Sequence, residues 1–491
     1  MKQKNRRSEN PKNTPISSDF TFSNIRNLIG RYDVIILFIA LFLVYNTVSG
    51  IGVVSGDTTP AVLLPAEIIN HHDLYLDSAT SYINNPDYSY AFLYTHGHYF
   101  SLFPIVTPVL VTPLYGLSYI LCTLVSVPFV GNVTILAGKT SAAGIVALAG
   151  IFVYLAGKEL FSKRIALIII VIFAFATSTW SISSQALWQH GMVELLFAVL
   201  LYLIIKNLKN KSWIYILFMG LISGLFVFNR PPDAILLIPV LFYMVWYQRQ
   251  KIHIYLAGCL ITGLPFLYYN YTVFGNIFGG YSENLSLFTF NSSFVAHYLG
   301  LLVSPNVGLF VYCPVLILSL AGIYVIEKRK ESPLKKVMLV AGLAVLLEVL
   351  LYSFFILWYS SAAFCFGPRF LTGLVPVLCL FIGYFLDDWF GSGASRHQEF
   401  PKRICMIIVG GLILSSVCIQ FIGTYYYGWS PHSNMVMTED RAWNISDSVI
   451  VNSYVIGSQN IPVLYVYSIP PVPPLYLYYS QERVEKLNSL S

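Results

Sequence analysis

An aspartate follows the first long apolar run of the chain, in the stretch SGDTTPAVLLP. Asp57 comes about five residues after the run 33–52, so we expect it at a membrane–water boundary. Thr59 and Pro60 are residue types that begin helices, and a helix start beside Asp57 favours its ionised form. An ionised carboxylate at such a boundary suits a general base that acts on a hydroxyl. Alternatively, Asp57 only caps the helix or pairs with a Lys or Arg.

Three basic residues stand at the ends of other apolar runs, in AGKTSAAG, FNRPPDA and FGPRFL. They are Lys139, Arg230 and Arg369, and we expect all three at the same boundary as Asp57. An anionic lipid head group or a phosphate would explain them, because the planar fork of Arg matches phosphate oxygens. The alternatives are an ion pair of Arg230 with Asp233, and simple anchoring of Lys139 and Arg369 at the interface.

Several His and aromatic residues are further candidates for binding. The motif THGHY has an HxH spacing that could hold a metal together with a carboxylate, but it is a weak signal, and no HExxH motif is present. Contacts to a sugar or an acceptor are predicted for His98, Tyr99, Trp188 and His190. Polar packing under loops is the alternative. No cofactor is predicted, and a divalent metal is not indicated.

Two acidic residues fall inside apolar runs. Glu194 comes one turn after His190, and we expect it to share the same cavity. Glu348 stands in the middle of VLLEVLL and must face protein or water, because a carboxylate is costly in lipid. It is the best sequence evidence for an ion pathway.

The composition shows what kind of molecule positions these residues. Of the 491 residues, 56% are hydrophobic and 11% are charged, with a mean hydropathy of +0.67. A soluble domain carries about 25% charged residues, so a soluble protein is excluded, as are collagen-like, disordered and disulfide-rich chains. The seven Cys show no CxxC spacing and are interpreted as apolar packing residues.

The apolar runs predict an all-α polytopic membrane protein with about eleven transmembrane helices. The predicted spans are 33–52, 141–157, 165–180, 190–206, 213–229, 234–247, 253–271, 307–326, 337–359, 369–386 and 404–424.

The basic residues predict the orientation. With these spans, 23 of the 29 Lys and Arg residues fall on one side, which the positive-inside rule assigns to the cytoplasm. Residues 1–31 form a basic cytoplasmic tail, and 32–424 form the transmembrane domain. The large segments 53–101, 272–306 and 425–491 lie outside and are predicted to cap the outer face.

This orientation requires that the apolar stretch 102–137 makes no net crossing. Its prolines at 104, 108, 113 and 128 favour a re-entrant or interfacial segment. Two short spans are the alternative and give the same orientation.

Several sequence islands resemble the GT-C superfamily of polytopic glycosyltransferases, which includes the protein O-mannosyltransferases and the lipid A aminoarabinose transferases. The islands, which run through about residues 30–390, are SGDTTPAVLLP, HGHYFSLFPIVTPVLVTPLY, GKELFSKR, SSQALWQHG, FNRPPDA, YNYTVFGNIFGGYS, LLVSPNVGLFVYCPV and FCFGPRFLTGLVPVL. The aminoarabinose branch has a Lys before a Pro-Pro pair where this chain reads FSLFP, so another residue must bind the phosphate here. The WWDxG motif of oligosaccharyltransferases is absent.

The resemblance implies a glycosyltransferase that uses a polyprenyl-phosphate-linked sugar donor. By the same resemblance, Asp57 is the base, and Arg230 and Arg369, with Lys139 third, bind the donor phosphate. The acceptor hydroxyl would belong to a glycan, a lipid or a protein on the outer face, and the reaction would invert the anomeric carbon. The implied location is the plasma membrane of a prokaryote, in contact with membrane lipid and without nucleic acid. The N-terminus is expected in the cytoplasm and the C-terminus outside.

Three other functions compete with this interpretation. The first is a multi-pass transporter or flippase of lipid-linked or anionic substrates, in which Glu348 would matter most, although no internal repeat supports it. The second is a polymerase or ligase of lipid-linked glycans, and the third is a non-catalytic scaffold. Replacing Asp57 by Asn should abolish turnover and keep the fold in a transferase, whereas a scaffold should be indifferent to it. In a transporter, Glu348→Gln should matter more than Asp57→Asn.

Overall fold

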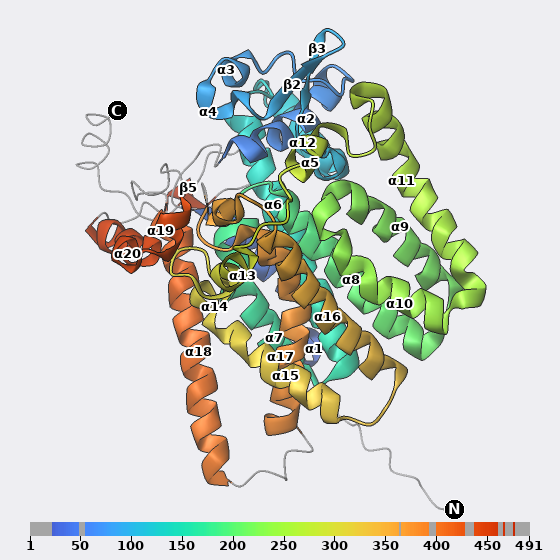
Figure 1. The fold of residues 1–491 in the computed structure, drawn as a ribbon, viewed down its shortest axis with the longest axis vertical. Coiled ribbons are helices and arrows are strands. Elements are labelled where there is room, and N and C mark those ends of the chain that lie inside the picture. The colour runs from blue at the N-terminus through green and yellow to red at the C-terminus, as the bar shows by residue number, and fades with distance from the viewer. Residues whose placement is uncertain are drawn as a thin grey trace, which may run out of the picture.

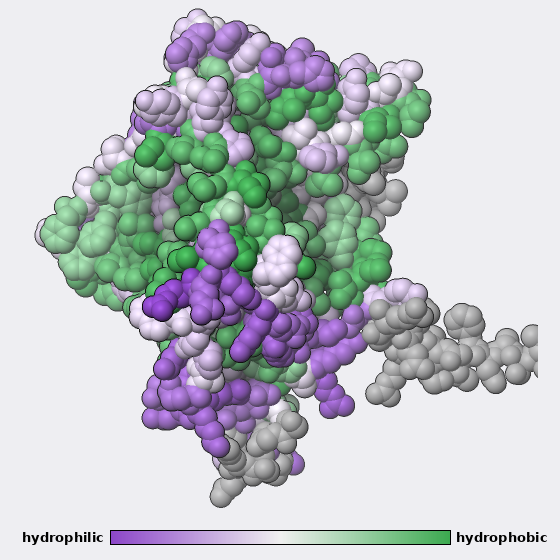
Figure 2. All heavy atoms as spheres, turned by 90° about the vertical axis from the view of Figure 1, so that its right-hand side faces the viewer, coloured by the Kyte–Doolittle hydropathy of each residue, from purple (hydrophilic) through white to green (hydrophobic). Residues whose placement is uncertain are grey.

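The computed structural model describes residues 22–48, 55–362, 365–391, 399–427 and 437–459, and the two-residue strands 465–466 and 475–476. Long helices run side by side through most of the molecule, and a smaller cap lies over one of its ends (Figure 1). Apolar side chains gather around the middle of the molecule, with hydrophilic side chains toward its two ends (Figure 2). This distribution matches a helical bundle that crosses a bilayer, with the cap outside the hydrocarbon.

Except for α5, the long helices follow the predicted spans. They are α1 (Phe22–Tyr45), α5 (Val106–Leu124), α6 (Asn132–Leu160), α7 (Lys163–Phe175), α8 (Gln189–Asn210), α9 (Trp213–Asn229), α10 (Ile238–Tyr247), α11 (Ile252–Phe274), α15 (Leu318–Lys328), α16 (Pro333–Ser353), α17 (Val375–Phe390) and α18 (Glu399–Tyr425). The prediction of an all-α polytopic fold is confirmed. Among the described residues, six helices are long and apolar enough to cross a membrane, and four more are apolar but shorter.

Short elements form the cap and the connections. They are α2 (Thr59–Asn70), α3 (Thr80–Ile83), α4 (Pro86–Ser89), α12 (Ser282–Leu285), α13 (Phe294–Val303), α14 (Leu309–Tyr312), α19 (Glu439–Trp443), α20 (Val449–Gln459), the hairpin β2 (Phe92–Thr95) and β3 (His98–Ser101), and the strands β1 (Thr47–Val48), β4 (Tyr465–Val466) and β5 (Leu475–Tyr476). One predicted span, 307–326, is interrupted. Pro314 lies between α14 and α15, and a 3-10 turn (Pro314–Ile317) joins the two helices.

Contacts between helices fix their directions. Asp33, near the start of the apolar part of α1, pairs with Lys158 of α6 at 3.3 Å and with Lys163 of α7 at 2.8 Å. At the other end of α1, the Tyr45 hydroxyl donates to the Ala174 carbonyl of α7 at 3.2 Å. Helix α6 is therefore antiparallel to α1 and α7, and it begins at the end where α1 finishes. The stretch between them makes no net crossing, as predicted.

Within that stretch, the chain forms one continuous helix rather than two short spans. Helix α5 contains Pro113, and the Thr107 hydroxyl donates to Asn229, at the last residue of α9, at 2.6 Å. Tyr115 donates to the Val62 carbonyl of α2 at 3.0 Å. The opposite face of α5 is apolar and exposed at Leu110, Leu114, Leu117, Ile120, Leu121 and Leu124. A helix anchored to the cap on one face and apolar on the other fits the interfacial form of the prediction.

Small residues allow the closest helix contact, between α9 and α11. Gly220 and Gly224 of α9 form a GxxxG pattern that faces the backbone of α11. A Cβ atom on Gly258 of α11 would lie 2.6 Å from the Leu217 carbonyl oxygen of α9, so only glycine fits there. This contact holds the end of α9, which carries Arg230, against the neighbouring helix.

Part of the C-terminal segment is anchored to the body. Asn306, in the loop before α14, donates through its side-chain amide to the carbonyls of Arg441, Asn444 and Asp447, at 2.8, 3.1 and 3.2 Å. Its side-chain oxygen accepts the Val449 N–H at 2.8 Å. These bonds place α19 and α20 beside the upper end of α18 (Figure 1). The Pro- and Tyr-rich sequence SIPPVPPLYLYY lies almost entirely outside the described residues.

Candidate active site

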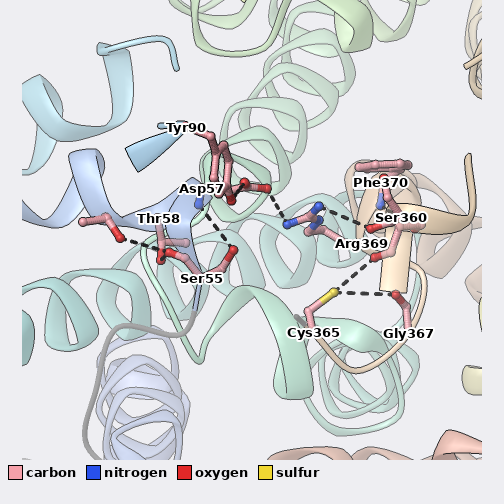
Figure 3. Close-up of polar contacts among 11 residues, drawn as sticks. Ser55, Asp57, Thr58, Tyr90, Ser360, Cys365, Gly367, Arg369 and Phe370 are labelled. Carbon is pink, nitrogen blue, oxygen red and sulfur yellow. Dashed lines mark hydrogen bonds and ion pairs between the residues drawn. The ribbon is translucent and has the colours of Figure 1, made fainter. Parts of the chain in front are cut away.

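Asp57 lies in a 3-10 turn (Gly56–Thr58) that leads directly into α2. The predicted helix after Asp57 is thus confirmed, and Ser55 caps the turn by accepting the Asp57 N–H at 3.3 Å. Both carboxylate oxygens are bonded (Figure 3): Oδ1 accepts from the Tyr90 hydroxyl at 2.5 Å, and Oδ2 accepts from Arg369 Nη1 at 2.8 Å. Burial and the nearby Asp57 charge raise the pKa of Tyr90 above its usual value, so the phenol keeps its proton and is the donor.

Arg369 begins a 3-10 turn (Arg369–Leu374) that continues into α17. Its side chain is 7% exposed, and the guanidinium carbon lies 4.6 Å from the centre of the Trp188 ring and 5.4 Å from that of Phe370. Nη2 makes one long contact, 3.4 Å, to the Ser360 carbonyl. Nε is buried and has no hydrogen-bond partner among the described residues. The guanidinium is therefore held by ring contacts and keeps unused donors.

Arg230 is held differently. It caps the end of α9 and forms a buried ion pair with Asp233, which also accepts from the Tyr352 hydroxyl at 2.7 Å. The Arg230 guanidinium carbon lies 5.1 Å from the centre of the Tyr352 ring. Glu348 is close enough to interact electrostatically with both Arg230 and Asp233. The ion pair considered as an alternative for Arg230 is present, and Asp233 compensates its charge.

These side chains meet at one small cavity of about 50 Å³. It is lined by Asp57, Phe103, Trp188, Gln189, His190, Arg230, Tyr281, Arg369 and Phe370. The lining comes from segments that are far apart in the sequence, and it includes five of the eight predicted site residues. The cavity lies at the end of α8 opposite to Lys206 and Lys209, which pair with Glu159 at 2.6 and 2.9 Å.

His190 lies in the first turn of α8, directly after Trp188, and is almost fully buried. Its ring centre lies 6.2 Å from that of Trp188 and 6.3 Å from that of Phe370. The Nδ1 atom has no partner within the described part of the chain. A buried ring nitrogen without a partner is unusual, and His190 lines the cavity.

The other three predicted site residues lie outside the cavity. The Lys139 ammonium is buried and donates to the Ser184 carbonyl and, at 3.3 Å, to Gln185 Oε1. His98 lies in the β2–β3 hairpin of the cap, where Nδ1 bonds Asp77 at 2.6 Å. Tyr99 donates its backbone N–H to the same carboxylate at 2.8 Å.

The motif THGHY thus forms a tight hairpin turn, with His96 and Gly97 at positive φ. Burial tends to raise the pKa of Asp77, but the hydrogen bonds from His98 and the Tyr99 N–H outweigh it and lower that pKa. Polar packing explains this motif. Within the residues that the structure describes, no group of three His, Cys, Asp or Glu side chains could hold a metal ion.

The expectation that Glu194 shares the cavity of His190 is wrong. Glu194 accepts from Ser183 at 2.5 Å and from Thr179 at 2.9 Å, and both belong to the π-turn (Thr179–Ser183) before α8. Glu194 is buried there because three hydroxyls, including that of Thr372, satisfy its oxygens.

Sequence reasoning missed five residues that contact the cavity or Asp57. One of them, Gln189, lies between the predicted Trp188 and His190. Phe370 directly follows Arg369, and Tyr281 lies in the segment YNYTVFGNIFGGYS, so both could have been selected from their sequence neighbours. Phe103 lies in FSLFP. Tyr90 carries no sequence signal, because its contact with Asp57 depends on how the cap folds.

Comparisons with known proteins agree with this architecture. The family model described as dolichyl-phosphate-mannose-protein mannosyltransferase matches residues 129–269. The structure of ArnT from Cupriavidus metallidurans bound to undecaprenyl phosphate is similar, with a TM-score of 0.50, 12% identity, and coverage of 90% of this chain and 78% of ArnT. The chain has the GT-C glycosyltransferase fold. This confirms the resemblance to the GT-C glycosyltransferases at the level of the fold, and the apolar helices are those of an integral membrane protein.

A second solved structure matches with a lower TM-score. The apo oligosaccharyltransferase from Archaeoglobus fulgidus is 13% identical, with a TM-score of 0.47, and the match covers 92% of this chain and 62% of that enzyme. No curated protein sequence matches the chain significantly.

Proposed function

We propose that the protein transfers a sugar from a polyprenyl-phosphate donor to an acceptor hydroxyl, with Asp57 as the general base. The observation that supports this most is the cavity that joins a carboxylate to two guanidinium groups and an unpaired imidazole nitrogen. A carboxylate facing cationic donors across a small cavity suits attack by a hydroxyl on a carbon that bears a phosphate leaving group.

The donor phosphate binds mainly to Arg369. This guanidinium has unused donors and lines the cavity, whereas the charge of Arg230 is largely compensated by Asp233. The similar ArnT structure holds undecaprenyl phosphate, which supports a polyprenyl phosphate as the lipid carrier. Arg230 and His190 contribute further contacts to the phosphate or the sugar. Lys139 is not needed for this step, because its ammonium already bonds Ser184 and Gln185.

The reaction is a single displacement. Asp57 takes the proton of the acceptor hydroxyl, and the acceptor oxygen forms a bond to the anomeric carbon. The bond between that carbon and the phosphate oxygen breaks, its electron pair stays on the phosphate, and Arg369 stabilises the added negative charge. The configuration inverts because attack and departure occur on opposite faces. The protonated Asp57 then loses its proton to water.

The sugar lies between the aromatic side chains of the cavity. Trp188 and Tyr281 offer an apolar face and polar edges, which suit the two sides of a sugar ring. The cavity lies away from the end that carries the basic pairs of Glu159, so by the positive-inside rule it opens to the outer side. The acceptor is then a glycan, lipid or protein on that side, and the N-terminus lies in the cytoplasm.

A donor panel tests this function. The purified protein in nanodiscs is given polyprenyl-phosphate sugars that differ in the sugar, and release of polyprenyl phosphate and transfer to added acceptors are measured. One donor should support transfer, and NMR of the product should show the opposite anomeric configuration from the donor. Asp77→Asn is a matched control, because it makes the same change at a capped carboxylate outside the cavity. A product with retained configuration, or no release from any donor, would overturn the proposal.

A further inference from the structure

Asp57 is restrained in a way that does not suit a working base. Its two oxygens already accept from Tyr90 and Arg369, and the carboxylate is only 25% exposed. An incoming hydroxyl would have to compete with both donors. In this arrangement the site is closed to acceptor chemistry.

Arg369, unlike Asp57, has hydrogen-bond donors without a partner, although its side chain is fixed in place. The Trp188 and Phe370 rings hold its plane, so the guanidinium keeps its position when one partner leaves. Among the described residues, its only hydrogen bonds are the one to Asp57 and the long one to the Ser360 carbonyl, and Nε is buried without a partner. A phosphate in the cavity can take a bidentate contact with this guanidinium and would compete with Asp57 for it.

We propose that the Asp57–Arg369 ion pair is a lock that the phosphate of the donor opens, so that the donor binds before the acceptor. This inference rests on the proposed function. The phosphate takes Arg369 from Asp57, and the freed Oδ2 becomes available to the acceptor hydroxyl. When the lipid phosphate leaves, Asp57 regains Arg369 and the site closes again. The lock prevents Asp57 from activating water or acceptor while the donor is absent.

Tyr90 is the positioning residue of this lock. Its hydroxyl is bonded to Oδ1, the oxygen that Arg369 does not use, so it holds the carboxylate after the ion pair opens. The close contact of Gly56 with the Tyr90 ring fixes the tyrosine against the turn that carries Asp57, since a Cβ atom at Gly56 would lie 2.7 Å from the ring.

Binding of undecaprenyl phosphate without acceptor tests the lock. In nanodiscs, Asp57→Asn should lower the Kd of undecaprenyl phosphate by about fivefold, because the anion no longer competes with a carboxylate. Arg369→Gln should raise the Kd by at least about tenfold, since the charged bidentate contact is lost. Adding Asp57→Asn to Arg369→Gln should then change nothing, because the two effects depend on one ion pair. Arg369→Met, which also removes the charge, serves the same purpose if Arg369→Gln does not fold, and Asp77→Asn should leave the Kd unchanged.

The outcomes separate the lock from the proposed function. If Arg369→Gln does not weaken binding, the phosphate site itself is wrong. If Arg369→Gln weakens binding but Asp57→Asn does not tighten it, the site stands and the lock is refuted. The lock is also refuted if Asp57→Asn tightens binding equally in the Arg369→Gln background, because that result would reflect general repulsion between charges.

Kinetics test the role of Tyr90. Tyr90→Phe keeps the ring against Gly56 and removes the bond to Asp57, so kcat should fall by about tenfold while the Kd of undecaprenyl phosphate stays within about twofold. In the wild type, undecaprenyl phosphate should compete with the donor, and an unreactive acceptor analogue should bind only after the donor. An unchanged kcat in Tyr90→Phe, or acceptor binding without donor, would overturn the inference.

Discussion

Replacing Arg369 by Lys separates the charge of this residue from its shape. Lys keeps the positive charge beside Asp57 but loses the planar fork that a phosphate binds with two hydrogen bonds. It also loses the stacking between Trp188 and Phe370, whose ring centres lie 4.6 and 5.4 Å from the guanidinium carbon. The variant should therefore remain cationic and become a poor ligand for the donor phosphate.

The expected size follows from these contacts. Removing one preorganised donor for a developing negative charge costs about 100-fold in rate, or about 2.7 kcal/mol, and we expect this loss in kcat/KM for the donor. Stability should fall much less, by about 1–2 kcal/mol, because each ring contact contributes about 0.5–2 kcal/mol and an ammonium keeps part of it. The Asp57 carboxylate keeps its bond to Tyr90 and is partly exposed, so it is not left as a buried, isolated charge.

The assay is release of polyprenyl phosphate at several donor concentrations, with thermal unfolding as the check on folding. Arg329→Lys is the matched control, because Arg329 also stacks on an aromatic ring, Tyr384 at 4.8 Å, and pairs with a carboxylate, Asp387 at 2.9 Å, outside the cavity. It should keep kcat/KM within about twofold. A folded Arg369→Lys protein with nearly wild-type kcat/KM would refute the role given to the guanidinium.

Three further substitutions test other parts of the structure. Gly258→Ala should lower the free energy of unfolding by about 1–3 kcal/mol, and with it the thermal midpoint, because the added methyl group meets the Leu217 carbonyl. An unchanged midpoint would mean that α9 and α11 are further apart. Asn306→Ala removes the bonds to residues 441–449 and should speed proteolysis of the C-terminal segment, and equal cleavage rates would argue against the anchor. His98→Ala should cost under about 1 kcal/mol and leave transfer within about twofold, because His98 is a half-exposed partner of Asp77; a tenfold loss of transfer would instead support the sugar contact predicted from sequence.

The fold could be predicted because membrane spans are long apolar runs, which the sequence displays directly. Span 213–229 coincides with α9. Helix α5 was harder, because its prolines suggested a broken segment, yet Pro108 lies in the first turn and Pro113 is tolerated inside the helix. The backbone groups that Pro113 leaves free are compatible with a helix at the edge of the bundle.

The site was only partly accessible. Asp57, Arg230 and Arg369 could be predicted because charged residues at the ends of apolar runs are unusual. The position of a residue in such a run indicates only its depth in the membrane. Depth alone also selected Lys139, which bonds Ser184 instead, since the π-turn before α8 brings a carbonyl to it. Tyr90 lies in a polar loop, and no local sequence pattern predicts the conformation that brings it to Asp57. Lateral position around the bundle depends on helix packing, which a single sequence does not reveal.

The most direct test of the central claim is a single-turnover measurement with the Asp57→Asn variant. Donor is bound first, acceptor is added, and release of polyprenyl phosphate is followed beside the wild type and Asp77→Asn. The proposed chemistry predicts that Asp57→Asn binds the donor, keeps its thermal stability and transfers sugar about 10²–10⁴-fold more slowly, while Asp77→Asn behaves like the wild type. Wild-type transfer by a folded Asp57→Asn protein would show that Asp57 is not the base.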